Sequence, residues 1–598
     1  MKLSRLYSNH DEVFTPIDFQ PGLNVVLAEI RLPENREKDT HNLGKTTLGT
    51  LIDFCLLARR DRRMFLFKHE DLFEDYVFFL EVELSSGGYV TIRREVEEAS
   101  KISFKRHLSP GQDLRDLAEE QWDHYKVPFD RARTLLDGLL NLTALRPWDY
   151  RKGLGYFLRT QDDYTDVFQL RRFASAHADW KPFIAHMLGF DAQLVTDFYD
   201  KETEIETLKG KEKTIEAELG GSIEDLSKVE GLLLLKQKQA EKQQSLLDSF
   251  DFRSHDKDRT KNLVDEVDDE IATLNSERYT LMYNRKKILS SLEEGELFFN
   301  PDEAARLFQE VGVFFEGQIK HDYEQLISFN RAITEERRGY LLEEKADVDT
   351  RLREVSSELN KLGKKRAEIL SFLSDTDVVR KYKDVSQELI ELRSDVLSLS
   401  RQREHLQSLQ KLRTQIRTAV EEASHLEVIL EKDFEEKNNS QNESVYTTIR
   451  ILFDAILQDV LSRSALLTVS LNQQHHPEFE AEILDDSGNA TSAERGHTYK
   501  KLLCIAFDLA LLRAHNDEGF PSFVYHDGVF ESLDKRKKSN LVGVIRDYAD
   551  LGIQQIITLI DTDMPPQEGG EPVFSEDEIV LRLHDEGIDG RLFKIKSW

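Results

Sequence analysis

Two apolar runs, one near each end of the 598-residue chain, end in polar residues as buried strands do. The first run, Leu23–Ala28, leads through a polar loop into Gly44-Lys45-Thr46, where a helical pattern begins. The second run, Phe523–Asp527, has largely apolar residues before its acid. Because short strand and helix patterns alternate around both runs, the sequence predicts α/β structure at both chain ends.

The long segment between these ends carries a seven-residue apolar repeat. Apart from interruptions at Glu212, Ser222 and Arg403, its positions are Ile205, Leu208, Ile215, Leu219, Leu226, Val229 and Leu233 on the way out and Tyr382, Val385, Leu389, Leu392, Val396, Leu399 and Leu406 on the way back. This spacing predicts a left-handed coiled coil, because a repeat of about 3.5 residues keeps an apolar seam facing its partner helix. Ordinary amphipathic core helices are the alternative.

These patterns divide the chain into five segments. They are an N-terminal half-domain at 1–195, an ascending helical arm at 196–297, an apolar arm tip at 298–317, a descending arm at 318–436 and a C-terminal half-domain at 437–598. We expect the helices of the arm to break near residues 249–252 and 371–377, where the repeat stops. The apolar tip either closes the helical hairpin or offers a docking surface to a partner.

Local patterns also predict two β-hairpins. Tyr76–Leu84 and Tyr89–Ile92 are rich in β-branched and aromatic residues, and a glycine turn joins them. Near the C-terminus, Ile579–Leu583 and Arg591–Ile595 have the same character on either side of an Asp-Glu-Gly turn.

Composition narrows the class of protein. The chain has 81 basic and 112 acidic side chains, which give a net charge of −31. A protein that coats DNA needs a positive field, so this charge excludes nucleic-acid binding through bulk charge. Its two cysteines, Cys55 and Cys504, lie in apolar helical patterns, which excludes a disulfide framework and is typical of a reducing compartment. No apolar stretch approaches the ~20 residues of a membrane span. We therefore expect a cytoplasmic protein that does not enter a membrane.

Gly44, Lys45 and Thr46 predict a site for ATP and Mg²⁺. In a P-loop, backbone N–H groups at a helix start cradle the phosphates, the lysine reaches the β- and γ-phosphates, and the hydroxyl binds Mg²⁺. Asn42 and Thr47 flank these residues and are expected to line the same site.

Asp527 is the expected carboxylate ligand of this Mg²⁺, since it ends the second buried strand. A plain buried strand that ends in a turn is the alternative interpretation of this segment.

Together, the two nucleotide motifs and the heptads between them resemble the SMC/RecN group of ABC ATPases. The resemblance implies an α/β ABC-type P-loop ATPase head formed by both chain ends, with a long inserted antiparallel α-helical coiled coil. A narrower resemblance, to the bacterial YydD-like family, is carried by Asn42–Thr47, Gly496–Lys501, the His526-Asp527 strand end and Gly590–Lys594. It implies the ATPase component of an anti-phage defence system, either Lamassu-like or a three-component ABC system.

The resemblance also implies further site residues. Gln161 is placed like the glutamine of the Q-loop, which senses Mg²⁺ and the γ-phosphate, although a surface glutamine is the alternative. Gly496, His497 and Thr498 are placed like the signature segment that completes the site of a second subunit, although the Ser-Gly-Gly-Glu core of that segment is absent. Asp534 follows Asp527 by seven residues, like the aspartate of the D-loop.

A further departure from this family concerns the catalytic glutamate. The glutamate that orients the attacking water in ABC ATPases is replaced by Gly528, so we expect slow ATP hydrolysis. Glu531 or His526 are the residues that could take over the water.

Three functional classes follow. The first is an SMC-like ATPase subunit whose head dimerises with a second copy on ATP, senses double-stranded DNA and controls a separately encoded effector and accessory subunits in bacterial defence. The second is a RecN-like ATPase of DNA repair or chromosome maintenance. The third is a non-catalytic coiled-coil scaffold with an ATP-binding head.

DNA contact in so acidic a chain requires local basic patches. The candidates are Arg59, Arg60, Arg62 and Arg63, which follow the P-loop helix, and Arg93 and Arg94, which end the first predicted hairpin. Salt bridges to the abundant acids are the alternative role for these arginines.

Overall fold

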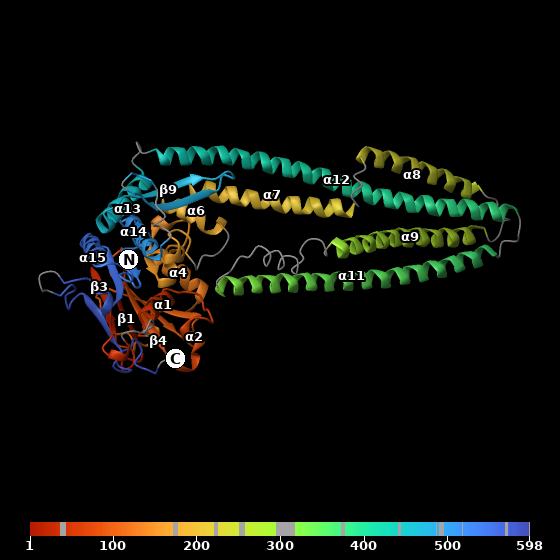
Figure 1. Ribbon diagram of the computed structural model, residues 1–598. Coiled ribbons are helices and arrows are strands. Elements are labelled where there is room, and N and C mark those ends of the chain that lie inside the picture. Colours follow the sequence, from red (N-terminus) through yellow and green to blue (C-terminus); the bar gives the residue numbers. More distant parts are fainter. Residues whose placement is uncertain are drawn as a thin grey trace. The chain divides into compact units, whose positions relative to one another are not determined.

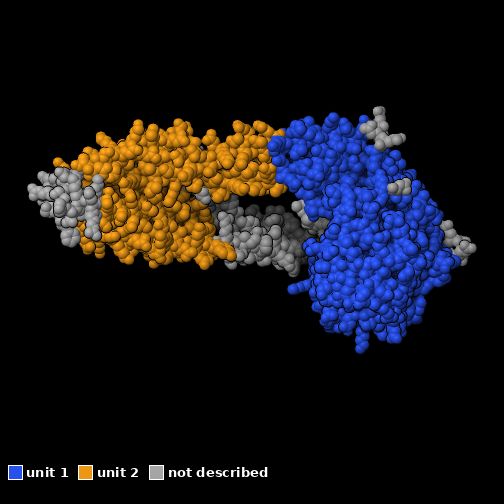
Figure 2. Space-filling model, turned by 180° about the vertical axis from the view of Figure 1, so that it is seen from behind, with its two compact units in different colours: residues 1–202, 422–598 blue, residues 203–421 orange. Residues whose placement is uncertain are grey.

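The computed structural model divides the chain into two compact units (Figures 1 and 2). The head comprises residues 1–202 and 422–598, and the arm comprises residues 203–421. The structure describes residues 1–35, 43–170, 177–219, 225–249, 257–294, 317–371, 377–439, 444–485, 487–489, 496–516, 518–567 and 572–596.

A parallel sheet of five strands forms the centre of the head. In sheet order its strands are β13 (Ile579–His584), β3 (Leu23–Glu29), β12 (Gln554–Ile560), β11 (Phe523–His526) and β8 (Leu158–Arg159). The sequence shows β3 and β11 as continuous apolar runs because parallel strands are covered on both faces. Both predicted buried strands therefore lie in one sheet, with β12 between them.

A second sheet of six antiparallel strands belongs to the same unit. Its order is β2 (Ile17–Asp18), β1 (Lys2–Ser8), β4 (Val77–Glu83), β5 (Tyr89–Glu95), β6 (Lys101–His107) and β7 (His124–Pro128). The β4–β5 pair is the predicted first hairpin, with Gly87 and Gly88 in its turn at positive φ.

The helices of the head pack around these sheets (Figure 1). They are α1 (Lys45–Cys55), α2 (Phe65–Lys68), α3 (Glu70–Phe73), α4 (Phe129–Leu140), α5 (Tyr150–Phe157), α6 (His177–Met187), α13 (Val445–Leu461), α14 (His497–Ala514) and α15 (Lys535–Asp550). Every residue of α14 from Lys501 to Leu512 is buried, so this helix lies in the core of the head. A hairpin of β9 (Ala465–Leu471) and β10 (Pro477–Ile483) completes the unit.

The predicted C-terminal hairpin is wrong. Only its first half forms a strand, β13, and that strand pairs in parallel with β3 instead of with the residues that follow it. The second half packs against the beginning of the chain: Leu592 N–H donates to the carbonyl of Leu43, and Phe593 lies 5.2 Å from Phe14 between ring centroids. Burial of these apolar side chains outweighs the local hairpin pattern.

The arm consists of long helices. They are most of α7 (Ala192–Glu218), α8 (Leu226–Ser249), α9 (Lys257–Glu294), α11 (Gly317–Ser371) and most of α12 (Asp377–Asn438). Helix α12 runs antiparallel to α7 and α8: Arg413 Nε bonds to Glu212 2.7 Å away, and Lys236 Nζ to Asp395 2.7 Å away. The predicted architecture, an α/β head formed by both chain ends with an inserted antiparallel helical arm, is thus confirmed.

Beyond α8 the arm folds back on itself, which the heptads do not reveal. Arg393 of α12 pairs with Asp269 of α9, and Arg401 donates to Thr280 Oγ1 at 2.6 Å, so α9 runs beside α12 in the same direction. Helices α9 and α11 lie side by side (Figure 1). The two predicted breaks coincide with helix ends, since α8 ends at Ser249 and α11 at Ser371, whereas the predicted tip, residues 298–317, lies outside the described residues except for Gly317.

A buried polar group joins three helices at this fold. Arg366 of α11 lies 2.8 Å from the carboxylate of Asp268 in α9 and donates to Ser386 Oγ of α12 at 2.8 Å, and Ser386 in turn donates to Asp268. Burial raises the pKa of Asp268, while Ser386 and Arg366 oppose that shift. Such a group specifies register, because a shift of one helix would leave a buried charge without its partner.

None of the described helices combines the length and the apolar character that a membrane crossing requires.

Candidate functional site

The start of α1 has features of a phosphate-binding helix start. Gly44 caps α1 with φ 109°, and a Cβ there would lie 2.5 Å from Leu592 Cβ, so both the backbone and the space require glycine. Lys45 begins the helix with a side chain that is only 11% exposed. Thr47 is half-buried, and Asn42 lies outside the described residues. The free N–H groups at this helix start suit an anion.

Thr46 and Asp527 meet although 481 residues separate them. Thr46 Oγ1 donates to Asp527 Oδ2 at 2.6 Å, and Thr558 Oγ1 of the neighbouring strand β12 donates to Oδ1 at 2.6 Å. Asp527 is fully buried at the end of β11. A hydroxyl and a carboxylate are the hard oxygen donors that Mg²⁺ takes alongside substrate phosphates, so this pair fits the expected ion. Thr558 is a site residue that the sequence did not reveal.

Gly528 leaves room for the side chain of Glu531. Its φ is +63°, and a Cβ at this position would lie 2.7 Å from Cδ of Glu531 and 2.9 Å from Nε2 of Gln161. Gln161, which begins the 3₁₀ turn Gln161–Thr165 after β8, donates to Glu531 Oε1 at 2.7 Å. The structure thus brings three predicted residues together, Gln161, Asp527 and Glu531, around Gly528.

Two lysines, of which Lys501 is buried and Lys45 largely so, face this carboxylate. Lys45 Nζ lies 4.0 Å from Glu531 Oε1, and Lys501 Nζ lies 3.6 Å from Oε2. Burial lowers the pKa of both ammonium groups, while Asp527 and Glu531 favour their charged forms. Lys501 is a second site residue whose role the sequence did not reveal: there it is only the last residue of the Gly496–Lys501 segment that carries the narrower resemblance.

The interpretation of His526 as a water-activating residue is wrong. Successive residues of a strand point to opposite faces, so His526 faces away from Asp527. Its side chain is fully buried, with Nε2 3.2 Å from Asp508 Oδ2. Asp508 also binds Arg159 through two contacts of 2.6 and 2.9 Å. His526 therefore belongs to a buried network that joins β8, α14 and β11.

The remaining nucleotide-site candidates lie at helix starts. Gly496 caps α14 and is exposed, as is His497, and Thr498 is half-buried. Asp534 caps α15 by accepting the N–H of Lys537 at 3.0 Å. Their contacts with a second subunit remain predictions.

The basic candidates separate into two groups. Arg94 is 1% exposed and donates to the carbonyls of Phe54, Ala58 and Ala99, so the prediction that it contacts DNA is wrong: it ties the end of α1 to β5. Arg93 is largely buried and pairs with Glu95 at 2.5 Å.

Arg59, Arg60, Arg62 and Arg63, by contrast, are exposed. Three of them pair with acids: Arg59 with Asp130 at 3.8 Å, Arg60 with Glu70 at 2.8 Å and Arg63 with Asp61 at 2.8 Å. Such exposed pairs are weak, so both predicted roles of these arginines stay open.

Residues 454–597 match a family described as "Uncharacterised protein conserved in bacteria (DUF2326)". No curated protein has a matching sequence. Among solved structures, the chain is similar to an Smc head domain with a coiled coil and joint from Pyrococcus yayanosii, at 16% identity and a TM-score of 0.36 over 94% of this chain and 92% of the other. It is also similar to an Smc head domain with an extended coiled coil, bound to the C-terminal domain of ScpA, from Pyrococcus furiosus. The identity there is 12% and the TM-score 0.33, over 94% and 91% of the two chains.

Substitution of Gly528 by Ala tests the packing of this site. The added Cβ must displace Glu531, and φ +63° is strained for alanine, so we expect a loss of about 1–3 kcal/mol in the free energy of unfolding of the head. Gly543→Ala on the exposed side of α15 is the matched control: nothing lies within 4 Å of its added Cβ, and alanine should stabilise this helix by about 0.5–1 kcal/mol. Thermal unfolding of both variants measures the difference, and equal effects would contradict the described geometry.

Proposed function

We propose that this chain is an SMC-like ATP switch whose head binds Mg-ATP and hydrolyses it slowly. The observation that carries the proposal is the 2.6 Å contact between Thr46 and Asp527, which joins a helix-start phosphate cradle to a buried magnesium-type carboxylate. Phosphoryl transfer depends mostly on positioning and on charges that stabilise the transition state. Lys45, Gln161 and Glu531 supply such groups beside that contact.

In this proposal, ATP closes two heads on each other. Lys45 reaches the phosphates of one ATP, and the start of α14 of a second copy, with Gly496, His497 and Thr498, completes the site. The exposure of Gly496 and His497 at the start of an 18-residue helix supports this role. ATP then shifts the population from separate to paired heads, because only the paired state offers the full set of phosphate contacts.

The physiological role that we propose is bacterial defence, in which head closure on double-stranded DNA controls a separately encoded effector and accessory subunits. The match to a family conserved in bacteria supports the bacterial setting. The loss of an acid at position 528 supports regulated, slow turnover, which suits a sensor better than a motor.

DNA would contact the exposed arginines that follow α1. Arg59 and Arg63 expose 77% and 91% of their side chains, and their exposed ion pairs are weak enough for phosphates to replace. The segment continues from the helix that Lys45 begins, which would couple phosphate contact to nucleotide state.

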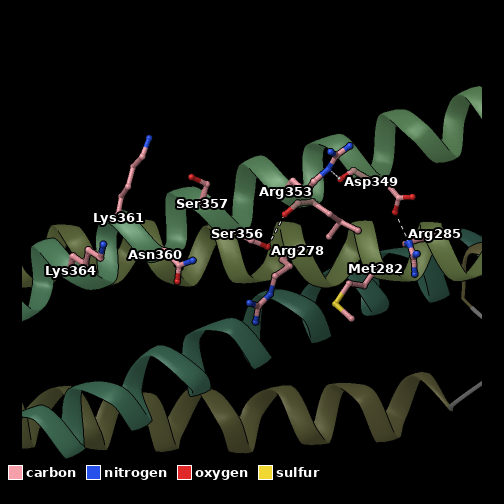
Figure 3. A pocket seen from close by; sticks show the side chains of 11 residues that line it. Arg278, Met282, Arg285, Asp349, Arg353, Ser356, Ser357, Asn360, Lys361 and Lys364 are labelled. Atoms are coloured by element: carbon pink, nitrogen blue, oxygen red, sulfur yellow. Dashed lines mark hydrogen bonds and ion pairs between the residues drawn. The ribbon is translucent and has the colours of Figure 1, made fainter.

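A groove in the arm offers a second surface of the same charge (Figure 3). It lies between α9 and α11 and has a volume of about 1230 Å³. Its charged lining residues are Arg278, Arg285, Arg353, Lys361 and Lys364, with Asp349 as the acid. Arg285 is bonded to Asp349 at 2.6 Å, whereas Lys361 and Lys364 are exposed one turn apart on α11. This spacing suits successive contacts with a phosphate backbone.

Nucleotide binding tests the core of the proposal. Lys45→Ala removes the ammonium group that is aimed at the phosphates, and we expect at least a tenfold loss of ATP affinity, on the order of 1.4 kcal/mol or more. Lys68→Ala, a change of the same chemistry at an exposed position in α2, should leave affinity unchanged. Titration with a fluorescent ATP analogue in Mg²⁺ measures both. Equal affinities in wild type and Lys45→Ala would remove the proposal.

Head pairing has a separate readout. Thr498→Val and Gly496→Val remove the predicted contacts in trans without touching the P-loop, so ATP affinity at low protein concentration should persist while ATP-dependent dimerisation weakens. Thr134→Val, on the exposed side of α4, is the control. Analytical ultracentrifugation with a non-hydrolysable ATP analogue measures the dimer fraction. A dimer fraction that ATP does not change in the wild type would contradict this mechanism.

The two DNA surfaces are distinguished by charge reversal. Glutamate at positions 59, 60, 62 and 63 should lower DNA affinity and reduce the slope of log K against log salt by about 0.9 for each phosphate that the protein no longer neutralises. Lys361→Glu with Lys364→Glu tests the arm groove, and Lys411→Glu with Arg417→Glu, exposed on α12, changes net charge equally as its control. Fluorescence anisotropy across salt concentrations gives the slopes. Unchanged slopes in both test variants would exclude both surfaces.

A further inference from the structure

Lys501 is an ammonium group enclosed by the nucleotide site. Its side chain is 1% exposed, and its Nζ donates to the carbonyl of Gly528 at 2.7 Å. The same Nζ lies 3.6 Å from Glu531 Oε2 and 5.5 Å from the ring centre of Tyr164. Burial of a charged lysine costs free energy unless an opposite charge and hydrogen bonds compensate it. The contacts with Gly528 and Glu531 provide this compensation and so fix the position of the ammonium group.

These contacts hold both ends of the turn from Gly528 to Glu531. The carbonyl of Gly528 accepts from Lys501 and from the N–H of Glu531 at 3.3 Å, and the carboxylate of Glu531 is held by Lys501 on one oxygen and by Gln161 on the other. Because a side chain at 528 would collide with this carboxylate, Gly528 and Glu531 are complementary. The carboxylate of residue 531 fills the space that a side chain at 528 would otherwise take.

We propose that Lys501 is a positioning residue, which holds Glu531 in place to orient the water that attacks the terminal phosphate of ATP. The inference rests on the proposed function. In the step, the water oxygen forms a bond to the γ-phosphorus, and the bond from that phosphorus to the bridging oxygen breaks. ADP leaves with that electron pair, and Glu531 accepts the proton of the water and returns it to solvent.

The position of Lys501 in the chain adds a regulatory consequence. It lies in the second turn of α14, the helix whose first residues, Gly496 to Thr498, are the predicted contacts in trans. Farther along the same helix, Asp508 binds Arg159 of β8. A second copy that contacts the start of α14 therefore lies on the same helix as the lysine that holds Glu531, which would make hydrolysis depend on head pairing.

The test compares Lys501→Met, which keeps the buried stem and removes the charge, with Glu531→Gln and with the double variant, all in the full chain. Single-turnover hydrolysis with enzyme in excess gives the rate, and titration with a fluorescent ATP analogue gives the affinity. We expect Glu531→Gln to slow the step by about 100-fold or more and Lys501→Met by about tenfold or more, with ATP affinity within about threefold of wild type. The double variant should be no slower than Glu531→Gln, because both changes remove one arrangement.

Lys501→Arg supplies the conservative control and should recover part of the rate lost in Lys501→Met. If Lys501→Met does not fold, as judged by circular dichroism, Lys501→Gln replaces it: its amide can still donate to the Gly528 carbonyl, but it cannot pair ionically with Glu531. A Lys501→Met or Lys501→Gln variant within twofold of the wild-type rate would overturn the inference. So would rate reductions that multiply in the double variant, or a wild type that binds ATP without hydrolysing it. Failure of the proposed function looks different, since the wild type would then bind no ATP.

Discussion

The pairing of β3 with strands from the far end of the chain is the constraint on which the rest of the structure depends. In this sheet β3 lies between β12 and β13, so Val25 pairs with Ile557 on one side and with Ile579 on the other. The whole insertion must therefore leave the head and return to it at nearly the same place. An antiparallel helical arm meets this requirement, because two helices of matched length bring the chain back to its starting point.

The same strand pairing brings the residues of the candidate site together. Helix α1 starts directly after the loop that follows β3, and Asp527 ends β11 two strands away, so the carboxyl ends of parallel strands meet at one edge. The charges gathered there are nearly balanced: Lys45 and Lys501 face Asp527 and Glu531. Since burial disfavours the charged forms of both lysines, a polyphosphate that brings its own negative charge and its own Mg²⁺ complements this site electrostatically.

The sequence predicted those parts of the site that depend on local pattern. Gly44, Lys45, Thr46 and Asp527 follow buried strands, and strand, loop and helix succession needs no knowledge of distant contacts. The positions of Lys501 and Thr558 depend on how α14 and β12 pack beside β11, which single-chain periodicity does not contain.

The wrong predictions have the same physical origin. Composition and motif position predict DNA contact for Arg94 and water activation for His526. The burial of both residues follows instead from the pairing of β5 and β11 with neighbouring elements. In the arm, the heptads identified helices and their breaks. They could not show that α9 returns beside α12, because a heptad seam specifies that a partner exists and leaves open which helix it is.

The folded arm also divides the insertion into two parts with unequal freedom to change in evolution. Helices α7 and α8 pair with α12 in one register. Residues added to α7 or α8 would break these pairs unless α12 gained the same number of residues. The pair α9 and α11 is joined to α12 through the buried Asp268, Arg366 and Ser386 and through Arg401 and Thr280, and the two helices also lie against each other. Length variation among relatives should therefore accumulate toward the end of α9 and the start of α11, in steps that preserve whole heptads, while α7, α8 and α12 keep a constant count.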